Sequence, residues 1–206
     1  MTSIKPIRDP ETDHLLTPEN CALLVIDYQA TQVNSINSML HDRLVDNIVF
    51  VVRVAKTYGL PIVLSTVNVE TKRNTDTIPR LKEALGEVVA HDRTAINAWE
   101  DREFLAAVQA TGRRKLIICA LWTEACMSLP TLDALREGYE VYPVVDAVGG
   151  TSVDAHRTAL RRVEQAGAQL TSLAHILCEL QRDWDRDATE KEFLQLMLEA
   201  ELFNAL

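Results

Sequence analysis

The chain has few of the residues that mark metal-binding and disulfide-linked proteins. Among its 206 residues are four cysteines and five histidines. The cysteines form no C-x-x-C pair and no metal-type spacing, which argues against a disulfide framework and a structural zinc site. The histidines show no H-x-H or H-x-x-x-H spacing, so we predict no bound metal and no cofactor. Each cysteine is then either a buried apolar residue or a thiol with chemistry of its own.

Excess positive charge and long apolar runs are also missing. Lys and Arg total 21 against 30 Asp and Glu, which gives a net charge of -9. Nucleic acids and anionic membranes attract Lys and Arg patches, so this balance argues against both as partners. No apolar run approaches the roughly 20 residues that span a bilayer. Residues 1–16 lack the basic flank and apolar core of a secretory signal. We therefore predict a cytoplasmic protein.

Glycine and proline are scarce, with seven of each, while 47% of the residues are hydrophobic. This composition supports one well-buried domain, and no shift in composition marks a second. We predict a single domain over residues 1–206, with an N-terminal extension over about 1–20. A C-terminal helical segment is expected over about 187–206.

Short apolar runs alternate with helical patterns along the chain. The runs are β-branched and nearly uncharged, as expected of strands that are covered on both faces. The runs are Cys21–Tyr28, Pro61–Val67, Lys115–Leu121, Glu140–Val148 and Ala168–Leu173. Helical patterns cover residues 40–55, the segment after Asn97, Glu124–Glu137 and Ser152–Ala166. The order predicts an α/β fold, Rossmann-like, with a mostly parallel central sheet between two helical layers.

Ligands in such folds bind beyond the carboxyl ends of the strands. Asp27 ends the otherwise apolar run LLVID. A carboxylate there is either a turn acceptor or a general base, because partial burial moves its pKa towards neutrality. Asp146 repeats this pattern, but Gly149 and Gly150 follow it and favour a turn role.

Cys126 lies in the first turn of a predicted helix, directly after the strand Lys115–Leu121. Unpaired N–H groups and the helix dipole favour a thiolate at such a position. The alternative is that Cys126 only packs in the core. Cys119 lies within a strand, Cys178 lies among apolar neighbours, and Cys21 opens a strand, so each is a weaker candidate nucleophile.

Four motifs, taken in order, resemble the isochorismatase-like cysteine hydrolases, and most closely their YcaC-like subfamily. They are CALLVIDYQ, RTAINAWED, LIICALWTEACMSLPTLDALREGYEVYPVVDAV and HRTALRRVEQAGAQLTS. The resemblance runs from about Cys21 to Asp183. It implies a Rossmann-like fold, hydrolysis of C–N bonds in small molecules, and a triad of Asp, a basic residue and Cys.

Carried over to this sequence, the resemblance makes Cys126 the nucleophile and Asp27 the base. Arg93 stands where the family usually has Lys. Arginine can hold Asp27 and favour the thiolate, but it cannot exchange a proton as a perturbed lysine can. The alternative for Arg93 is a structural ion pair at the end of a strand.

The resemblance also implies a cis peptide bond between Leu121 and Trp122. The N–H groups of Trp122 and Cys126 would then form an oxyanion hole. Substrate-pocket candidates are Gln29, Asn97, Trp99 and Thr123, although a tryptophan such as Trp99 is more often a core or interface residue than a pocket wall.

The predicted function is therefore amide-type hydrolysis of a small molecule through a Cys126 thioester. The alternative is a non-catalytic or redox-responsive thiol protein on the same scaffold, which the Arg93 position keeps open. We also expect a homo-oligomer. The family resemblance and the amphipathic segment from Glu192 to Leu206 both favour it.

Overall fold

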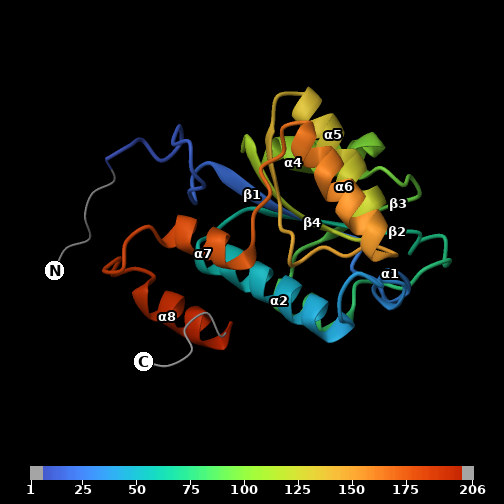
Figure 1. Ribbon diagram of the computed structural model, residues 1–206, viewed down its shortest axis with the longest axis horizontal. Coiled ribbons are helices and arrows are strands. Elements are labelled where there is room, and N and C mark those ends of the chain that lie inside the picture. The colour runs from blue at the N-terminus through green and yellow to red at the C-terminus, as the bar shows by residue number, and fades with distance from the viewer. Residues whose placement is uncertain (1–6, 201–206) are drawn as a thin grey trace.

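The computed structural model describes residues 7–200 and has a parallel sheet of five strands at its centre (Figure 1). The strand order is β3-β2-β1-β4-β5 and every pairing is parallel. The strands are β1 (Cys21–Ile26), β2 (Ile62–Val67), β3 (Ala90–Arg93), β4 (Lys115–Ala120) and β5 (Glu140–Pro143). The predicted fold class is confirmed.

Helices cover both faces of the sheet. One layer contains α2 (His41–Thr57), α7 (Leu173–Gln181) and α8 (Glu190–Glu199), with α3 (Pro79–Leu85) packed on α2. The other layer contains α4 (Arg102–Ala110), α5 (Ser128–Arg136) and α6 (Val153–Gln165), which Figure 1 shows on the opposite side. The short α1 (Ala30–Asn34) follows β1.

Strand β1 alternates between the two cores, as successive side chains of a strand must. Leu23 and Val25 pack with α2 and α7, whereas Leu24 and Ile26 pack with α4 and α5. All six residues of β1 are buried. This explains why the strand is continuously apolar in the sequence, and it leaves Asp27 as the first charged group beyond it.

Two edge elements differ from the sequence prediction. Strand β3 has the polar sequence AHDR, so it is not an apolar run. The predicted strand Ala168–Leu173 is wrong: it is an extended segment with one bridge, Val144 to Thr171, and Leu173 already begins α7. Strand β5 also ends at Pro143, before the predicted Val148, because the chain turns and the Ala147 N–H donates to the Val144 carbonyl oxygen.

Helix starts also differ in detail. Asn97 caps only a short 3₁₀ turn, Ala98–Glu100, where its side chain accepts the N–H of Trp99. Helix α4 starts later, with the side chain of Asp101 accepting two backbone N–H groups. Aspartate and asparagine are both strong caps, so two adjacent caps produced two short elements where the sequence predicted one.

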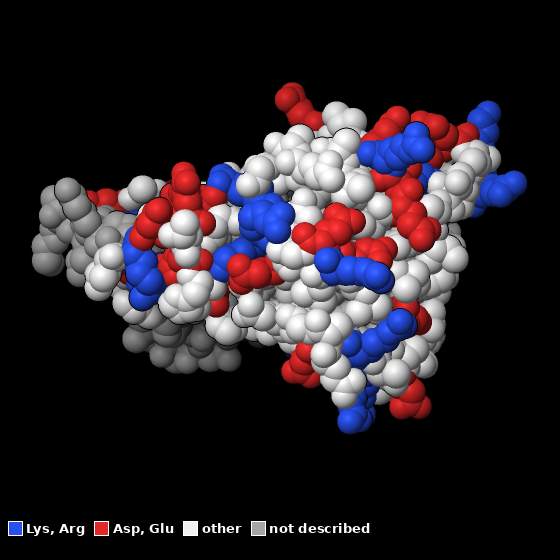
Figure 2. Space-filling model, turned by 90° about the horizontal axis from the view of Figure 1, so that it is seen from above, with Lys and Arg blue, Asp and Glu red and all other residues white. Residues whose placement is uncertain are grey.

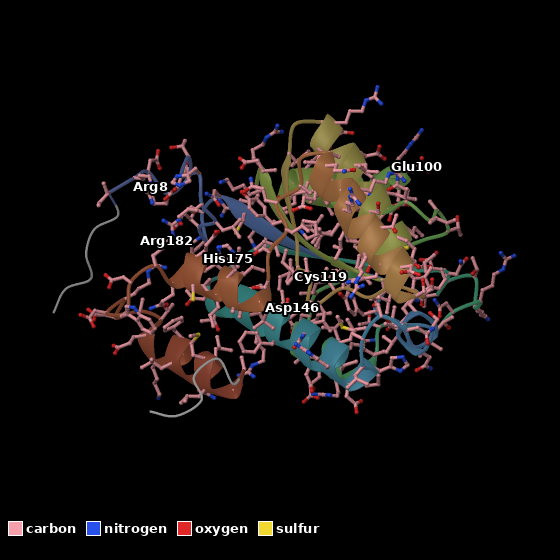
Figure 3. The ribbon with its side chains drawn as sticks, in the orientation of Figure 1. Arg8, Glu100, Cys119, Asp146, His175 and Arg182 are labelled. Atoms are coloured by element: carbon pink, nitrogen blue, oxygen red, sulfur yellow. The ribbon has the colours of Figure 1, made fainter. Side chains whose placement is uncertain are left out.

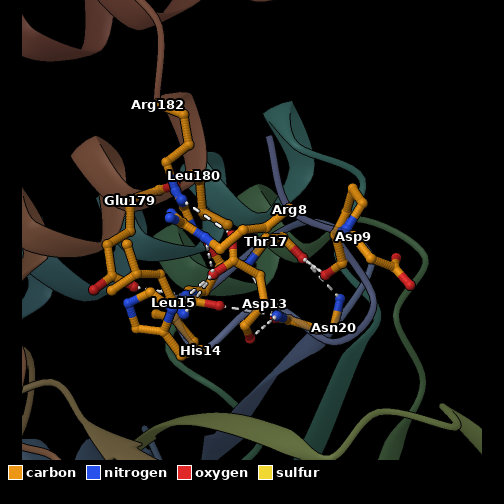
Figure 4. Close-up of polar contacts among 12 residues, drawn as sticks. Arg8, Asp9, Asp13, His14, Leu15, Thr17, Asn20, Glu179, Leu180 and Arg182 are labelled. Atoms are coloured by element: carbon orange, nitrogen blue, oxygen red, sulfur yellow. Dashed lines mark hydrogen bonds and ion pairs between the residues drawn. The ribbon is translucent and has the colours of Figure 1, made fainter. Parts of the chain in front are cut away.

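The described part of the N-terminal extension lies against α7 (Figure 4). Asp13 pairs with Arg8 and Arg182, and its pKa falls to about 2, because hydrogen bonds and charge from these groups and from Leu15 N–H outweigh the effect of burial. The buried Lys115 ammonium donates to the carbonyl of His14. The extension is therefore part of the domain and closes the end of the sheet opposite Asp27.

Figure 2 shows acidic and basic side chains interspersed over the face that it displays. Within residues 7–200, no helix combines the length and apolar character needed to cross a membrane. In the same range, no three His, Cys, Asp or Glu side chains gather in an arrangement that would hold a metal ion. Half of the predicted C-terminal segment is seen as α8, and residues 201–206 lie outside the described residues.

Candidate active site

Asp27 follows β1 in an unusual backbone conformation. Its φ of 64° is in the left-handed region, where aspartate is tolerated better than most residues. The Asp27 N–H donates to the Ser65 carbonyl at 3.0 Å, and the Asp27 carbonyl accepts the N–H of Gln29 at 2.8 Å. Such a conformation costs on the order of 1–3 kcal/mol and persists where the surroundings enforce it. This conformation turns the chain sharply at Asp27, directly after β1.

Arg93, the last residue of β3, binds this carboxylate with both ends of its guanidinium group. Nη1 donates to Oδ1 and Nη2 to Oδ2 of Asp27, each at 2.7 Å. Both side chains are fully buried, with 0% exposure. Although burial alone lowers the pKa of Arg93, the hydrogen bond and charge of Asp27 raise it above its ordinary value. The pair is therefore a fixed, internally neutral unit.

The rest of the Arg93 fork is also occupied by neighbours. Nη1 donates to Ser65 Oγ and to the Thr66 carbonyl, both at 3.0 Å, and Nη2 donates to the Ile96 carbonyl at 3.2 Å. Arg93 Nε is buried without a partner. Sequence reasoning missed Ser65, because a single serine in an apolar strand carries no signal of its own.

Cys126 lies on the other side of Asp27. It belongs to a π-helical turn, Thr123–Met127, that precedes α5, and it is 7% exposed. The peptide bond between Leu121 and Trp122 is cis, as predicted. The Trp122 N–H and the Asp27 carboxylate lie close enough to the Cys126 thiol to change its pKa, in opposite directions. We call residues 121–127 the nucleophile turn.

The pKa of the Cys126 thiol is raised above its ordinary value. Burial raises this pKa most, and the charge and hydrogen bond of Asp27 raise it further, whereas Arg93 and the Trp122 N–H lower it. The expected effect of the helix start, which would lower the pKa, acts here against burial and Asp27. Asp27 has a larger effect on the pKa of the Cys126 thiol than Arg93 has, because both terminal nitrogens of Arg93 are bound to Asp27.

The other three thiols lie away from Asp27 and Arg93. Cys119 is buried inside β4, and burial and Asp146 raise its pKa; Figure 3 places these two residues close together. Burial raises the pKa of Cys21 to about 12 and also raises that of Cys178. The Asp146 carboxylate accepts the N–H of Leu173 at the start of α7, which is a structural role.

Two of the predicted pocket residues, Gln29 and Trp99, make contacts inside the protein. Gln29 uses its amide to hold the end of β2 and the loop after it, through Val67 and Thr75. Trp99 is in the core, where its indole N–H donates to Glu137 and its ring meets Tyr139 edge-on. The polar groups of both side chains are therefore hydrogen-bonded to other residues of the protein.

Asn97 and Thr123 are likewise engaged. Asn97 donates to Asp133 at 2.7 Å and lines a depression of about 500 Å³. Its other lining residues are Ile96, Glu100, Leu129, Leu132, Asp133 and Arg162. The buried Thr123 pairs its hydroxyl with His156, a residue that the sequence did not single out.

Known proteins are similar to this chain in sequence and in fold. The isochorismatase domain model matches residues 21–175. The probable hydrolase YcaC of Escherichia coli is 36% identical over 173 residues, which cover 84% of this chain and 83% of that protein.

Two solved YcaC structures agree. That of E. coli superposes with a TM-score of 0.81 at 31% identity, covering 98% of this chain and 100% of that one. That of Pseudomonas aeruginosa gives 0.81 at 30% identity, with 92% and 98% covered. The chain therefore belongs to the isochorismatase family of hydrolases, as a YcaC-like member.

Proposed function

We propose that the protein hydrolyses the C–N bond of a small amide through a thioester on Cys126. The observation that carries this proposal is the position of Asp27. Its carboxylate lies close enough to the Cys126 thiol to raise the pKa of that thiol, and both of its oxygens bind the Arg93 guanidinium, at the carboxyl ends of β1, β3 and β4. A nucleophile, a base within hydrogen-bond reach and a group that orients the base are the usual requirements of nucleophilic catalysis.

The first half of the reaction forms the thioester. Cys126 Sγ attacks the amide carbon while Asp27 takes the thiol proton, and the electron pair of the carbonyl moves to its oxygen. The N–H groups of Trp122 and Cys126 bind that oxyanion. Asp27 then gives the proton to the amine nitrogen as the C–N bond breaks.

Water completes the cycle. Asp27 takes a proton from water as the water oxygen attacks the thioester carbon, and the C–S bond breaks to release a carboxylic acid. The proton returns from Asp27 to Cys126 Sγ. Arg93 stays charged throughout and transfers no proton, because its role is to hold the carboxylate oxygens in place.

The same contacts favour a substrate without charge. Both terminal nitrogens of Arg93 are already bound to Asp27 and to neighbouring carbonyl and hydroxyl groups. No free cation is therefore available from this residue for a carboxylate or phosphate. One relative supports a small amide electrophile, since the P. aeruginosa YcaC structure carries covalent acrylamide.

A panel of small neutral amides, followed by ammonia or amine release, tests the proposal. Cys126→Ala should abolish release from any amide that the wild type cleaves. Cys178→Ala is the matched control, because Cys178 is an exposed thiol outside the site, and it should keep full activity. Turnover that survives in Cys126→Ala would remove the thioester mechanism.

The alternative function is a thiol protein that reacts without turnover. Its support is that the E. coli relative is described as a hydrolase of unknown specificity and that Arg93 replaces the lysine usual in the family. Labelling of Cys126 by iodoacetamide, with no hydrolysis across the amide panel, would favour this second function.

We also propose a homo-oligomer. The E. coli YcaC relative is octameric, and helix α8 leaves Leu194 and Leu198 42% and 63% exposed, one turn apart on one face. Light scattering at micromolar concentration should give a mass that is a multiple of the 23.1 kDa chain. Leu194→Asp together with Leu198→Asp should reduce it. A wild-type monomer would contradict the proposal.

A further inference from the structure

The loop and the helix that follow β5 make hydrogen bonds to the nucleophile turn. The buried Thr123 donates its backbone N–H to the Gly149 carbonyl at 2.8 Å. Its hydroxyl lies 2.9 Å from Nδ1 of His156, in the first turns of α6. Thr123 is joined through one peptide bond to Trp122, whose N–H contacts the Cys126 thiol.

The contact between Thr123 and His156 ties two elements together. Thr123 opens the π-helical turn, so no carbonyl one turn earlier in that turn is available to its hydroxyl. The hydroxyl bonds instead to a side chain 33 residues away in another helix. Thr111, at the end of α4, makes only local contacts, and its hydroxyl donates to the Val108 carbonyl at 2.7 Å. Thr111 is therefore a matched threonine outside the nucleophile turn.

Gly150 allows α6 to approach this closely. A Cβ on Gly150 would lie 2.7 Å from Glu124 Oε2 and 2.9 Å from His156 Cβ, whereas one on Gly149 would lie 2.8 Å from Ile36 Cγ2. Neither glycine has a φ in the left-handed region, so what they supply is space. Gly150 thus explains how His156 reaches the nucleophile turn.

The ring of His156 is half-buried beside this turn. Burial lowers its pKa most; Arg157 lowers it too, and Glu124 raises it. The Glu124 carboxylate is itself held by Thr151, through the backbone N–H at 3.0 Å and the hydroxyl at 2.5 Å. The turn and the start of α6 therefore share two side-chain links, one at Thr123 and one at Glu124.

We infer that His156 is a positioning residue for the reaction at Cys126. By holding the Thr123 hydroxyl it fixes the chain on the carboxyl side of Trp122 and so restrains the Trp122 N–H, which lies in the peptide plane between Leu121 and Trp122, in its position facing the oxyanion. The inference rests on the proposed oxyanion hole. Because misplacing a reacting group by about 1 Å can cost about 10²-fold in rate, a link this close to the donor has a large effect.

Two electrophiles distinguish the effect of the oxyanion donors on the labelling rate from the effect of the thiol's own reactivity. Addition of Cys126 Sγ to the terminal carbon of acrylamide moves electrons to the amide oxygen, which then needs the donors; the thiol proton ends on the carbon next to the carbonyl. Displacement of iodide from iodoacetamide by Sγ creates no oxyanion. The ratio of the two Cys126 labelling rates, located by peptide mass, therefore reports donor placement.

His156→Leu and Thr123→Val should each lower the acrylamide-to-iodoacetamide ratio by about tenfold or more. The double variant should lower the ratio no further than either single variant, because both changes break one link. His156→Asn, which places an amide near the position of Nδ1, should restore most of the ratio. Thr111→Val, the matched control, removes only local bonds at the end of α4, among them the one to the Val108 carbonyl, and should leave the ratio unchanged.

An unchanged ratio in folded His156→Leu or Thr123→Val would overturn the inference. If circular dichroism shows that His156→Leu is unfolded, Thr123→Val, which keeps the shape of the side chain, decides the outcome. Failure of the proposed function looks different: the wild type would then release no ammonia or amine from any amide of the panel, whatever the ratio of the two labelling rates.

Discussion

Arg93→Ala is expected to lower the free energy of unfolding by about 3–5 kcal/mol, the usual effect of removing one partner of a buried ion pair. The Asp27 carboxylate would remain at 0% exposure with no cation to balance it. The two hydrogen bonds of 2.7 Å and those to Ser65 and Thr66 would be lost together. Urea unfolding at neutral pH measures the change.

Two further variants identify the cause. Arg93→Lys keeps the charge but loses the planar fork, so it should recover only part of the stability. Adding Asp27→Asn to Arg93→Ala should also recover part, because the buried charge is then gone. A loss of less than about 1 kcal/mol in Arg93→Ala would mean that the pair behaves as an exposed one, contrary to the structure.

Asp27→Asn is expected to have opposite effects on thiol reactivity and on turnover. Asp27 contributes to the raised pKa of Cys126 by charge and by a hydrogen bond, while Arg93 and the Trp122 N–H lower it. Removing the carboxylate leaves the lowering groups in place, so the pKa of the thiol should fall. Iodoacetamide should then label Cys126 faster at neutral pH, by up to about tenfold for each unit of pKa lost.

Hydrolysis should fall in the same variant by about 10²–10⁴-fold, because the proton acceptor is gone. Asparagine tolerates the left-handed φ of 64°, so the turn after β1 should persist. The pH profile of Cys126 labelling and the rate of amide release are measured side by side, with circular dichroism as the folding control. Slower labelling together with slower hydrolysis would show that Asp27 supports a resting thiolate, against the present account.

The interior of the sheet could be predicted from the sequence, whereas its edges could not. Strands β1 and β4 are buried at every position, which makes them apolar runs that any reader of the sequence can find. Strand β3 is polar, because an edge strand with half-buried residues needs no apolar run. The segment around Thr171 is apolar enough for a strand but makes only one bridge.

Two residues of the candidate site could be identified from their positions in the predicted fold, and the third from the resemblance to the family. Asp27 and Cys126 follow buried strands, so their places in the fold could be read from the sequence. Arg93 lies in a polar strand and carries no such signal. The raised pKa of Cys126 depends on burial and on the nearness of Asp27, and the contact of Thr123 with His156 joins residues far apart in sequence. Both are tertiary features that local patterns do not encode.

The location of the acyl group during turnover tests the central claim most directly. The protein is mixed with the activated ester p-nitrophenyl acetate, quenched in acid within the first turnover, digested and analysed by mass. The account predicts an acetyl group on the peptide that holds Cys126, in wild type and in Cys178→Ala. It predicts none there in Cys126→Ala, together with loss of the burst of p-nitrophenol. An acyl group found on another residue, or a burst that persists in Cys126→Ala, would contradict the account.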